Sequence, residues 1–185
     1  MRKVSALAGI VAATVAITLS VSSMTSRAQA GSNYADDRAA IEDLQARYLF
    51  AMDFHNPELY VTMFTEDGIL DVGSGEIKGR QAIRDTVAKM PNFGAGPVPP
   101  GLWPASGRHN ISNIVVKITG NTATGRAYWF HYANNNPERR GTFTGYGHYE
   151  DEMVKVNGQW LFSKRRIYNE QRKEWAYTGT GNPAW

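Results

Sequence analysis

The chain has 185 residues, with 20 Lys and Arg against 17 Asp and Glu, a formal net charge of +3, and no cysteine. Three basic residues and no acidic ones lie within the first 30 positions, so the following part of the chain carries 17 charges of each sign. The size of the chain predicts one domain. The balanced charge after residue 30 gives no support to nucleic-acid binding. Because there is no cysteine, disulfides cannot contribute to stability.

The first 30 residues have the pattern of an export signal. Residues 1–3 read Met-Arg-Lys, an apolar stretch follows from Val4 to Val21, and residues 28–30 read Ala-Gln-Ala. These are the charged start, apolar middle and small-residue site of a signal peptide, so we expect cleavage after Ala30 and a periplasmic or secreted protein without membrane contact. An uncleaved anchor is the alternative, because the apolar stretch is about long enough to span a bilayer.

An amphipathic helix is predicted from Asp36 to His55. Its apolar residues recur every three or four positions, which indicates one buried stripe: Ile41, Leu44, Tyr48, Leu49 and Met52. Asp53 comes one residue after this stripe. Its carboxylate is either a solvated acid at the helix end or an acid aimed into the space that the helix covers.

Two further helices and a pair of short strands complete the first half. Asn56-Pro57 provides a cap and a first-turn proline for a short helix that we expect to run through Phe64. A turn is predicted at 66–68, strands at 69–72 and 76–78, and a third helix at 80–90.

Residues 91–104 form a predicted loop that contains five of the eight prolines of the chain. The loop also carries Phe93, Leu102 and Trp103, large apolar groups that a solvated linker would not favour. We interpret it as the wall or lid of a pocket, with simple packing on the core as the alternative.

The second half reads as four long strands, rich in β-branched and aromatic residues. They are expected at 108–118, 122–134, 142–156 and 159–168, with hairpin turns at Gly120-Asn121 and Asn157-Gly158. Helices that precede a long meander predict an α+β domain, in which three N-terminal helices pack in a curved, mainly antiparallel sheet. We place this domain at 31–168 and a C-terminal tail at 169–185.

Six short motifs in this order resemble one family. They are YLFAMD at 48–53, MFTEDG at 63–68, KGRQAI at 78–83, RHNISN at 108–113, GHYEDE at 147–152 and GQWLF at 158–162. Over residues 34–168 the chain resembles the SnoaL-like branch of the nuclear transport factor 2-like (NTF2-like) superfamily. Ketosteroid isomerase, scytalone dehydratase, bile-acid dehydratase and lindane dehydrochlorinase share this cone-shaped fold, which hosts unrelated chemistries and noncatalytic binders.

The resemblance implies a catalytic pair of Asp53 and His109, one from the helix end and one from the first strand of the meander. A carboxylate that binds one imidazole nitrogen raises the basicity of the other, which can then take a proton from carbon. Tyr48 is expected to donate a hydrogen bond to the substrate. The alternatives are a surface Asp53, a structural His109 and a Tyr48 that belongs to the core.

Strand alternation gives further candidates. Trp129 and His131 share one face, which we expect to line the cavity, although one bulge would reverse this assignment. No acidic residue lies near them, as it often does in dehydratase-like relatives, and His131 is a possible polar substitute. His148 and Tyr149 face opposite ways, so a regular strand places at most one of them in the pocket.

Arg166 shares parity with Trp160 and Phe162 in the last strand, which predicts that it turns inward as a stabilising cation. The alternative is that the run Lys164–Arg166 is a solvated edge. The full set of predicted substrate-binding residues is Phe64, Leu102, Trp103, Trp129, His131 and Tyr149.

These residues predict a cofactor-independent lyase or isomerase that acts on a lipophilic small molecule, with homodimers or homotrimers expected. Four scattered histidines and no cysteine argue against a metal site, and no cofactor motif occurs. The competing hypothesis is a noncatalytic module that binds a hydrophobic ligand or a protein. A hydrolase that opens epoxides ranks third, because no convincing cluster of Asp, Arg and Asp can be assembled.

Overall fold

The computed structural model describes residues 34–90, 100–102 and 105–171. The chain divides into two units, 1–38 and 39–185, and the elements below lie in the second unit apart from the start of the first helix. The helices are the first helix at 34–53, α2 at Pro57–Val61 and α3 at Arg80–Lys89. The strands are β1 (Phe64–Asp71), β2 (Glu76–Lys78), β3 (Gly107–Thr119), β4 (Thr122–Ala133), β5 (Thr142–Val156) and β6 (Gln159–Asn169).

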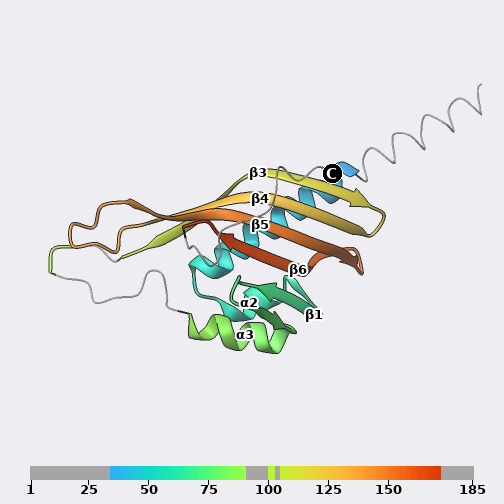
Figure 1. Ribbon diagram of the computed structural model, residues 1–185, viewed down its shortest axis with the longest axis horizontal. Coiled ribbons are helices and arrows are strands. Elements are labelled where there is room, and N and C mark those ends of the chain that lie inside the picture. The colour runs from blue at the N-terminus through green and yellow to red at the C-terminus, as the bar shows by residue number, and fades with distance from the viewer. Residues whose placement is uncertain (1–33, 91–99, 103–104, 172–185) are drawn as a thin grey trace, which may run out of the picture. The chain divides into compact units, whose positions relative to one another are not determined.

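The six strands form one mixed sheet in the order β2-β1-β6-β5-β4-β3 (Figure 1). Strands β3 to β6 form the predicted antiparallel meander, and β1 joins β6 in the parallel sense. Two local predictions were wrong: α2 ends at Val61, and residues 66–68 lie inside β1 where its register against β6 shifts. The predicted turn at 66–68 is therefore an irregularity within β1.

The first helix fills the inner face of the sheet. Ile41, Leu44 and Tyr48 have no exposed surface, and they belong to one apolar cluster that includes Ile83 of α3 and Phe162 of β6. Because a helical stripe must be buried against another element, this packing explains the periodicity of the helix. The predicted α+β fold, three helices against a curved sheet, is confirmed.

Three of the long strands contain an extra residue that interrupts their pairing. In β3 the register against β4 shifts between Ser112 and Val115, where Asn113 has a φ of 52°. In β5 the extra residue is Thr144, and in β6 it is Ser163. A bulge turns the following side chains to the opposite face, so these three positions decide which residues point inward.

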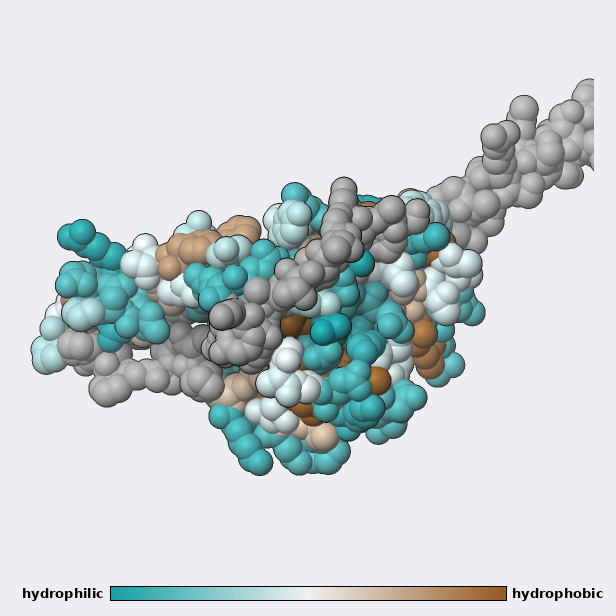
Figure 2. All heavy atoms as spheres, in the orientation of Figure 1, coloured by the Kyte–Doolittle hydropathy of each residue, from teal (hydrophilic) through white to brown (hydrophobic). Residues whose placement is uncertain are grey.

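Hydrophilic residues cover most of the surface seen in Figure 2, and hydrophobic ones show there as separate spots. No described helix has the length and hydropathy needed to cross a membrane. The predicted signal peptide, Trp103 and nearly all of the predicted tail lie outside the described residues. The domain boundaries therefore stay predictions.

Candidate active site

Asp53 ends the first helix, and both of its carboxylate oxygens bind His109. Oδ1 lies 2.6 Å from the Nδ1 atom of the His109 ring, and Oδ2 accepts a 2.9 Å hydrogen bond from the backbone N–H of the same residue. The side chains of Asp53 and His109 are 5% and 10% exposed. The two residues therefore lie in direct contact, and Asp53 is not a surface acid; the catalytic use of the pair stays a prediction.

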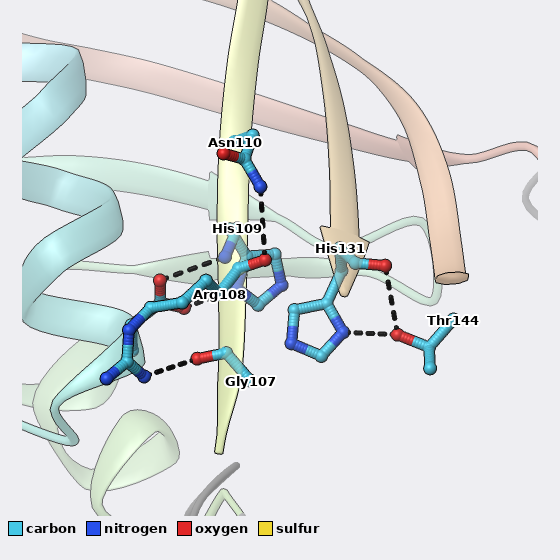
Figure 3. A network of polar contacts seen from close by, with 7 residues as sticks. Gly107, Arg108, His109, Asn110, His131 and Thr144 are labelled. Atoms are coloured by element: carbon cyan, nitrogen blue, oxygen red, sulfur yellow. Dashed lines mark hydrogen bonds and ion pairs between the residues drawn. The ribbon is translucent and has the colours of Figure 1, made fainter. Parts of the chain in front are cut away.

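The bulge in β3 makes this meeting possible. Val116 is buried, so unbroken alternation from it would place His109 on the outer face. The extra residue near Asn113 reverses the alternation and sets His109 opposite His131 of β4. The two imidazole rings lie with their centroids 4.2 Å apart (Figure 3). Strand alternation alone could not have found this arrangement.

His131 is buried, and its Nδ1 atom lies 2.5 Å from the hydroxyl of Thr144. Burial lowers the pKa of His131 to about 4, and the neighbouring His109 contributes to this lowering, while Asp53 acts in the opposite sense. His131 is therefore neutral near pH 7. The sequence predicted an inward His131, but it did not identify Thr144, whose position depends on the bulge in β5.

Trp129 crosses the inner face of the sheet from β4 to β6. Its indole N–H donates to the backbone carbonyl of Tyr168 at 3.0 Å, and its ring centroid lies 6.1 Å from that of His109. The ring passes over Gly145 and Gly147 of β5, where added side chains would meet it. Two glycines at positions i and i+2 of a strand leave one of its faces without side chains, so that a large ring can pack there. This pattern in β5 was visible in the sequence.

The two candidate tyrosines lie in different surroundings. Tyr48 has no exposed surface, and its hydroxyl forms a 2.6 Å hydrogen bond with Tyr60, as expected of the core alternative. Tyr149 stacks against Trp129 with ring centroids 6.2 Å apart. Burial raises the pKa of both Tyr48 and Tyr149, so both hydroxyls keep their protons near pH 7.

The prediction that Arg166 turns inward was wrong. Its side chain is 45% exposed and pairs with Asp71 at 3.2 Å. The physical reason is the extra residue Ser163, which breaks the alternation between Phe162 and the residues that follow. Arg165 is the arginine that points inward, and it is fully buried.

Arg165 forms a buried ion pair that the sequence did not reveal. Its guanidinium makes two 2.8 Å hydrogen bonds to Asp151 and lies 4.1 Å and 4.2 Å from the rings of Tyr48 and Tyr149. Burial alone would lower the pKa of Arg165, but the charge and hydrogen bonds of Asp151, together with Tyr48 and Tyr149, raise it above its ordinary value. Burial raises the pKa of Asp151, while the charge and hydrogen bonds of Arg165 act in the opposite sense. The guanidinium lies against the aromatic rings of the core beside Trp129.

The remaining candidates are less informative. Phe64 is fully buried among the rings of Tyr48, Tyr60 and Phe162, so it belongs to the core. Leu102 is half-buried, and Trp103 lies outside the described residues. No group of three or more potential metal ligands occurs among the described residues.

Helices that fill a curved sheet, with an inward Asp and His beside a tryptophan, define a domain of the NTF2-like class. The family model of the SnoaL-like domain matches residues 33–166, and the chain belongs to this family.

Solved structures agree with this placement. A candidate scytalone dehydratase from Novosphingobium aromaticivorans is 27% identical, with a TM-score of 0.59, covering 74% of this chain and 85% of that one. A protein of cystatin-like fold from Nostoc punctiforme is 27% identical, with a TM-score of 0.60 and coverages of 73% and 92%. A protein of unknown function from Mycobacterium tuberculosis shares the fold at 24% identity, with a TM-score of 0.63 and coverages of 77% and 82%. No curated protein matches the chain.

Proposed function

We propose that the protein is a cofactor-independent lyase or isomerase that removes a proton from carbon in a lipophilic small molecule. The observation that carries the proposal is the double attachment of Asp53 to His109, through the ring Nδ1 and through the backbone N–H. A carboxylate held in this way fixes the imidazole in the tautomer that leaves the lone pair on Nε2. That nitrogen is the proposed base.

The proposed reaction begins when His109 Nε2 takes a proton from a carbon next to an electron-withdrawing group. The imidazolium that forms lies beside the Asp53 carboxylate, which stabilises its charge. The proton then returns to another carbon, which is isomerisation, or to a leaving oxygen, which is elimination. Both outcomes use the same pair of residues.

Tyr149 is the tyrosine that we assign as hydrogen-bond donor to the substrate, in place of Tyr48. Tyr48 has no exposed surface, and its hydroxyl accepts a hydrogen bond from Tyr60 within the core, whereas no hydrogen bond joins the Tyr149 hydroxyl to the described part of the chain. Tyr149 also stacks on Trp129, which borders His109. Its proton is retained near pH 7, as a donor requires, because burial raises its pKa.

Export and assembly belong to the same proposal. The sequence of residues 1–30 supports cleavage and a periplasmic or secreted location. A groove of about 520 Å³ on the outer face of the sheet supports a homodimer or homotrimer, because aromatic residues line it, four of them exposed. These exposed residues are Tyr128, Tyr132, Phe143 and Tyr146.

The test uses 2-tetralone, a lipophilic ketone with exchangeable C–H protons, in deuterated buffer. Nuclear magnetic resonance (NMR) follows the loss of the α-proton signal with wild type, His109→Ala and the control Arg166→Ala. We expect wild type to accelerate exchange, His109→Ala to lose about 100-fold or more, and the control to stay close to wild type, since the Arg166 side chain is exposed.

Exchange that survives in His109→Ala contradicts the proposal. The noncatalytic binding module is favoured instead if 2-tetralone quenches tryptophan fluorescence but no variant, wild type included, accelerates exchange. The fixed position of Trp129 makes this binding measurable.

A further inference from the structure

A second pair of histidine and carboxylate lies on the outer face of the sheet. His148 of β5 follows the inward Gly147 and precedes the buried Tyr149, so strand alternation places its ring on the outer face. Its Nδ1 atom lies 2.7 Å from the carboxylate of Glu170, the residue that follows β6. Because a carboxylate can only accept, Nδ1 carries the hydrogen of this bond. The proposed chemistry on the inner face does not use this pair.

Tyr168 of β6 links the pair to the inner face. Its ring stacks on the ring of His148, with centroids 4.3 Å apart and planes only 12° from parallel. Its carbonyl oxygen points the other way, because it lies where the first carbon of an inward side chain at Gly147 would stand. This carbonyl accepts the indole N–H of Trp129 at 3.0 Å. One residue therefore contacts the outer pair with its ring and the wall of the site with its backbone.

The link lies at the end of a strand, which is the part of a sheet that opens most easily. β6 ends at Asn169, and the next backbone N–H, that of Glu170, still donates to the carbonyl of Tyr146 at 3.1 Å. The side-chain bond from His148 to Glu170 closes this end of the strand a second time. The peptide that carries the Tyr168 carbonyl is thus held from the outer face.

We infer that His148 and Glu170 are positioning residues for Trp129, which act from the outer face of the sheet through the carbonyl of Tyr168. The indole is the flat wall beside His109, with ring centroids 6.1 Å apart, so the pair sets the shape of the site from the opposite face. The inference goes beyond the proposed function, because it concerns the wall of the site and not the transfer of a proton.

The indole N–H of Trp129 reports this link without any ligand. ¹H–¹⁵N NMR spectra of the full chain resolve the indole signals, and Trp129→Phe identifies the signal of residue 129. We expect Glu170→Ala to shift this signal and to speed its exchange with solvent about tenfold, the size of one hydrogen bond. Glu170→Gln should keep the wild-type signal, because its side-chain oxygen still accepts from His148. Glu152→Ala, which removes an exposed glutamate of β5, is the matched control.

The backbone N–H of His109, which donates to Asp53 at 2.9 Å, serves as the internal reference. A general loss of stability speeds exchange at both positions, whereas loss of positioning acts on the indole alone. An unchanged indole signal in Glu170→Ala overturns the inference. Equal acceleration at the indole and at His109 overturns it as well.

His148→Phe tests the same link from the other partner. Phenylalanine keeps a ring that can stack on Tyr168, but it cannot donate to Glu170. We expect the same shift and the same faster exchange of the Trp129 indole as in Glu170→Ala. A wild-type indole signal in His148→Phe would show that the stacked ring alone suffices, and it would overturn the role of the pair.

The 2-tetralone assay separates the wall from the base. We expect Glu170→Ala to raise KM about threefold or more and to keep kcat close to wild type, since Asp53 and His109 stay in place. A fall in kcat with unchanged KM would overturn the inference. If wild type does not accelerate exchange, the proposed function fails, and the indole signal still decides whether the pair positions Trp129.

Discussion

Asp53 lies at the C-terminal end of the first helix, where the helix does not stabilise a negative charge. A carboxylate at the C-terminal end of a helix is opposed by the helix dipole, and this one is nearly buried. The two hydrogen bonds from His109 offset that cost. The residue is therefore explained by its partner, and this supports a role in orienting the base.

The histidine beside this pair makes stability depend on pH. The pKa of His131 is about 4 in the folded protein, below its ordinary value of 6.5, because burial and His109 disfavour the charged form. Between these values the unfolded chain binds a proton that the folded protein does not. The contribution of His131 is therefore present above about pH 6.5 and is lost as the pH falls toward about 4.

We expect His131 to reduce the free energy of unfolding by about 2 kcal/mol between about pH 7 and about pH 5. Urea denaturation of wild type and His131→Gln at both pH values measures this, with His55→Asn as control because Asn suits the positive φ of residue 55. The loss should shrink in His131→Gln and persist in the control. An unchanged loss in His131→Gln would contradict this explanation.

At the scale of elements, the bulges are the features that build the site. The extra residues in β3, β5 and β6 turn His109 inward, bring Thr144 to His131 and place Arg165 inside. Periodicity predicted every long strand, because regular alternation and hairpin turns are local signals. It could not predict the faces beyond a bulge, and the choice of Arg166 over Arg165 shows the consequence.

The bulge in β3 is tested at Asn113, an exposed residue with a φ of 52°. A β-branched residue is strained there, so Asn113→Val should cost about 1 to 3 kcal/mol of stability and also slow proton exchange. Asn113→Gly serves as the matched control and should keep both properties. Thermal unfolding and the 2-tetralone assay measure them. Wild-type behaviour of Asn113→Val would show that the bulge does not depend on this residue.

The bare face of β5 offers a second matched pair. A Cβ at Gly147 would overlap the carbonyl oxygen of Tyr168, whereas a Cβ at Gly145 would lie 3.5 Å from the Trp129 ring and 3.3 Å from the flexible Gln171 side chain. We expect Gly147→Ala to lose about 2 kcal/mol or more and to shift the Trp129 indole N–H signal in NMR spectra. Gly145→Ala should stay close to wild type. Equal effects of the two changes would contradict this description.

At the scale of the whole molecule, the sequence was sufficient for the fold but not for the surroundings of the site. The three helices, the meander and the inward Trp129 follow from patterns along the chain, and the pairing of Asp53 with His109 followed from the resemblance to a family. The buried ion pair of Arg165 and Asp151 could not be predicted from the sequence, because it depends on the register between β5 and β6. Two glycines in β5 were a visible signal whose meaning needed the Trp129 ring above them.

The two faces of the sheet differ in the side chains that they present. The inner face holds the pair of histidines and the indole, whereas the outer face exposes tyrosines and a phenylalanine around a groove. Arg126 of β4 forms an ion pair with Glu150 of the neighbouring β5 at 3.0 Å. The proposed chemistry requires the inner face alone.

The most direct measurement of that chemistry is the rate of proton exchange with Asp53→Asn. The amide cannot accept from both the ring and the backbone of His109, so the tautomer and orientation of the base are no longer fixed. We predict a loss of about 100-fold or more in the exchange of 2-tetralone, with thermal unfolding still cooperative. Exchange at the wild-type rate in the folded variant would contradict the role of Asp53 in orienting the base.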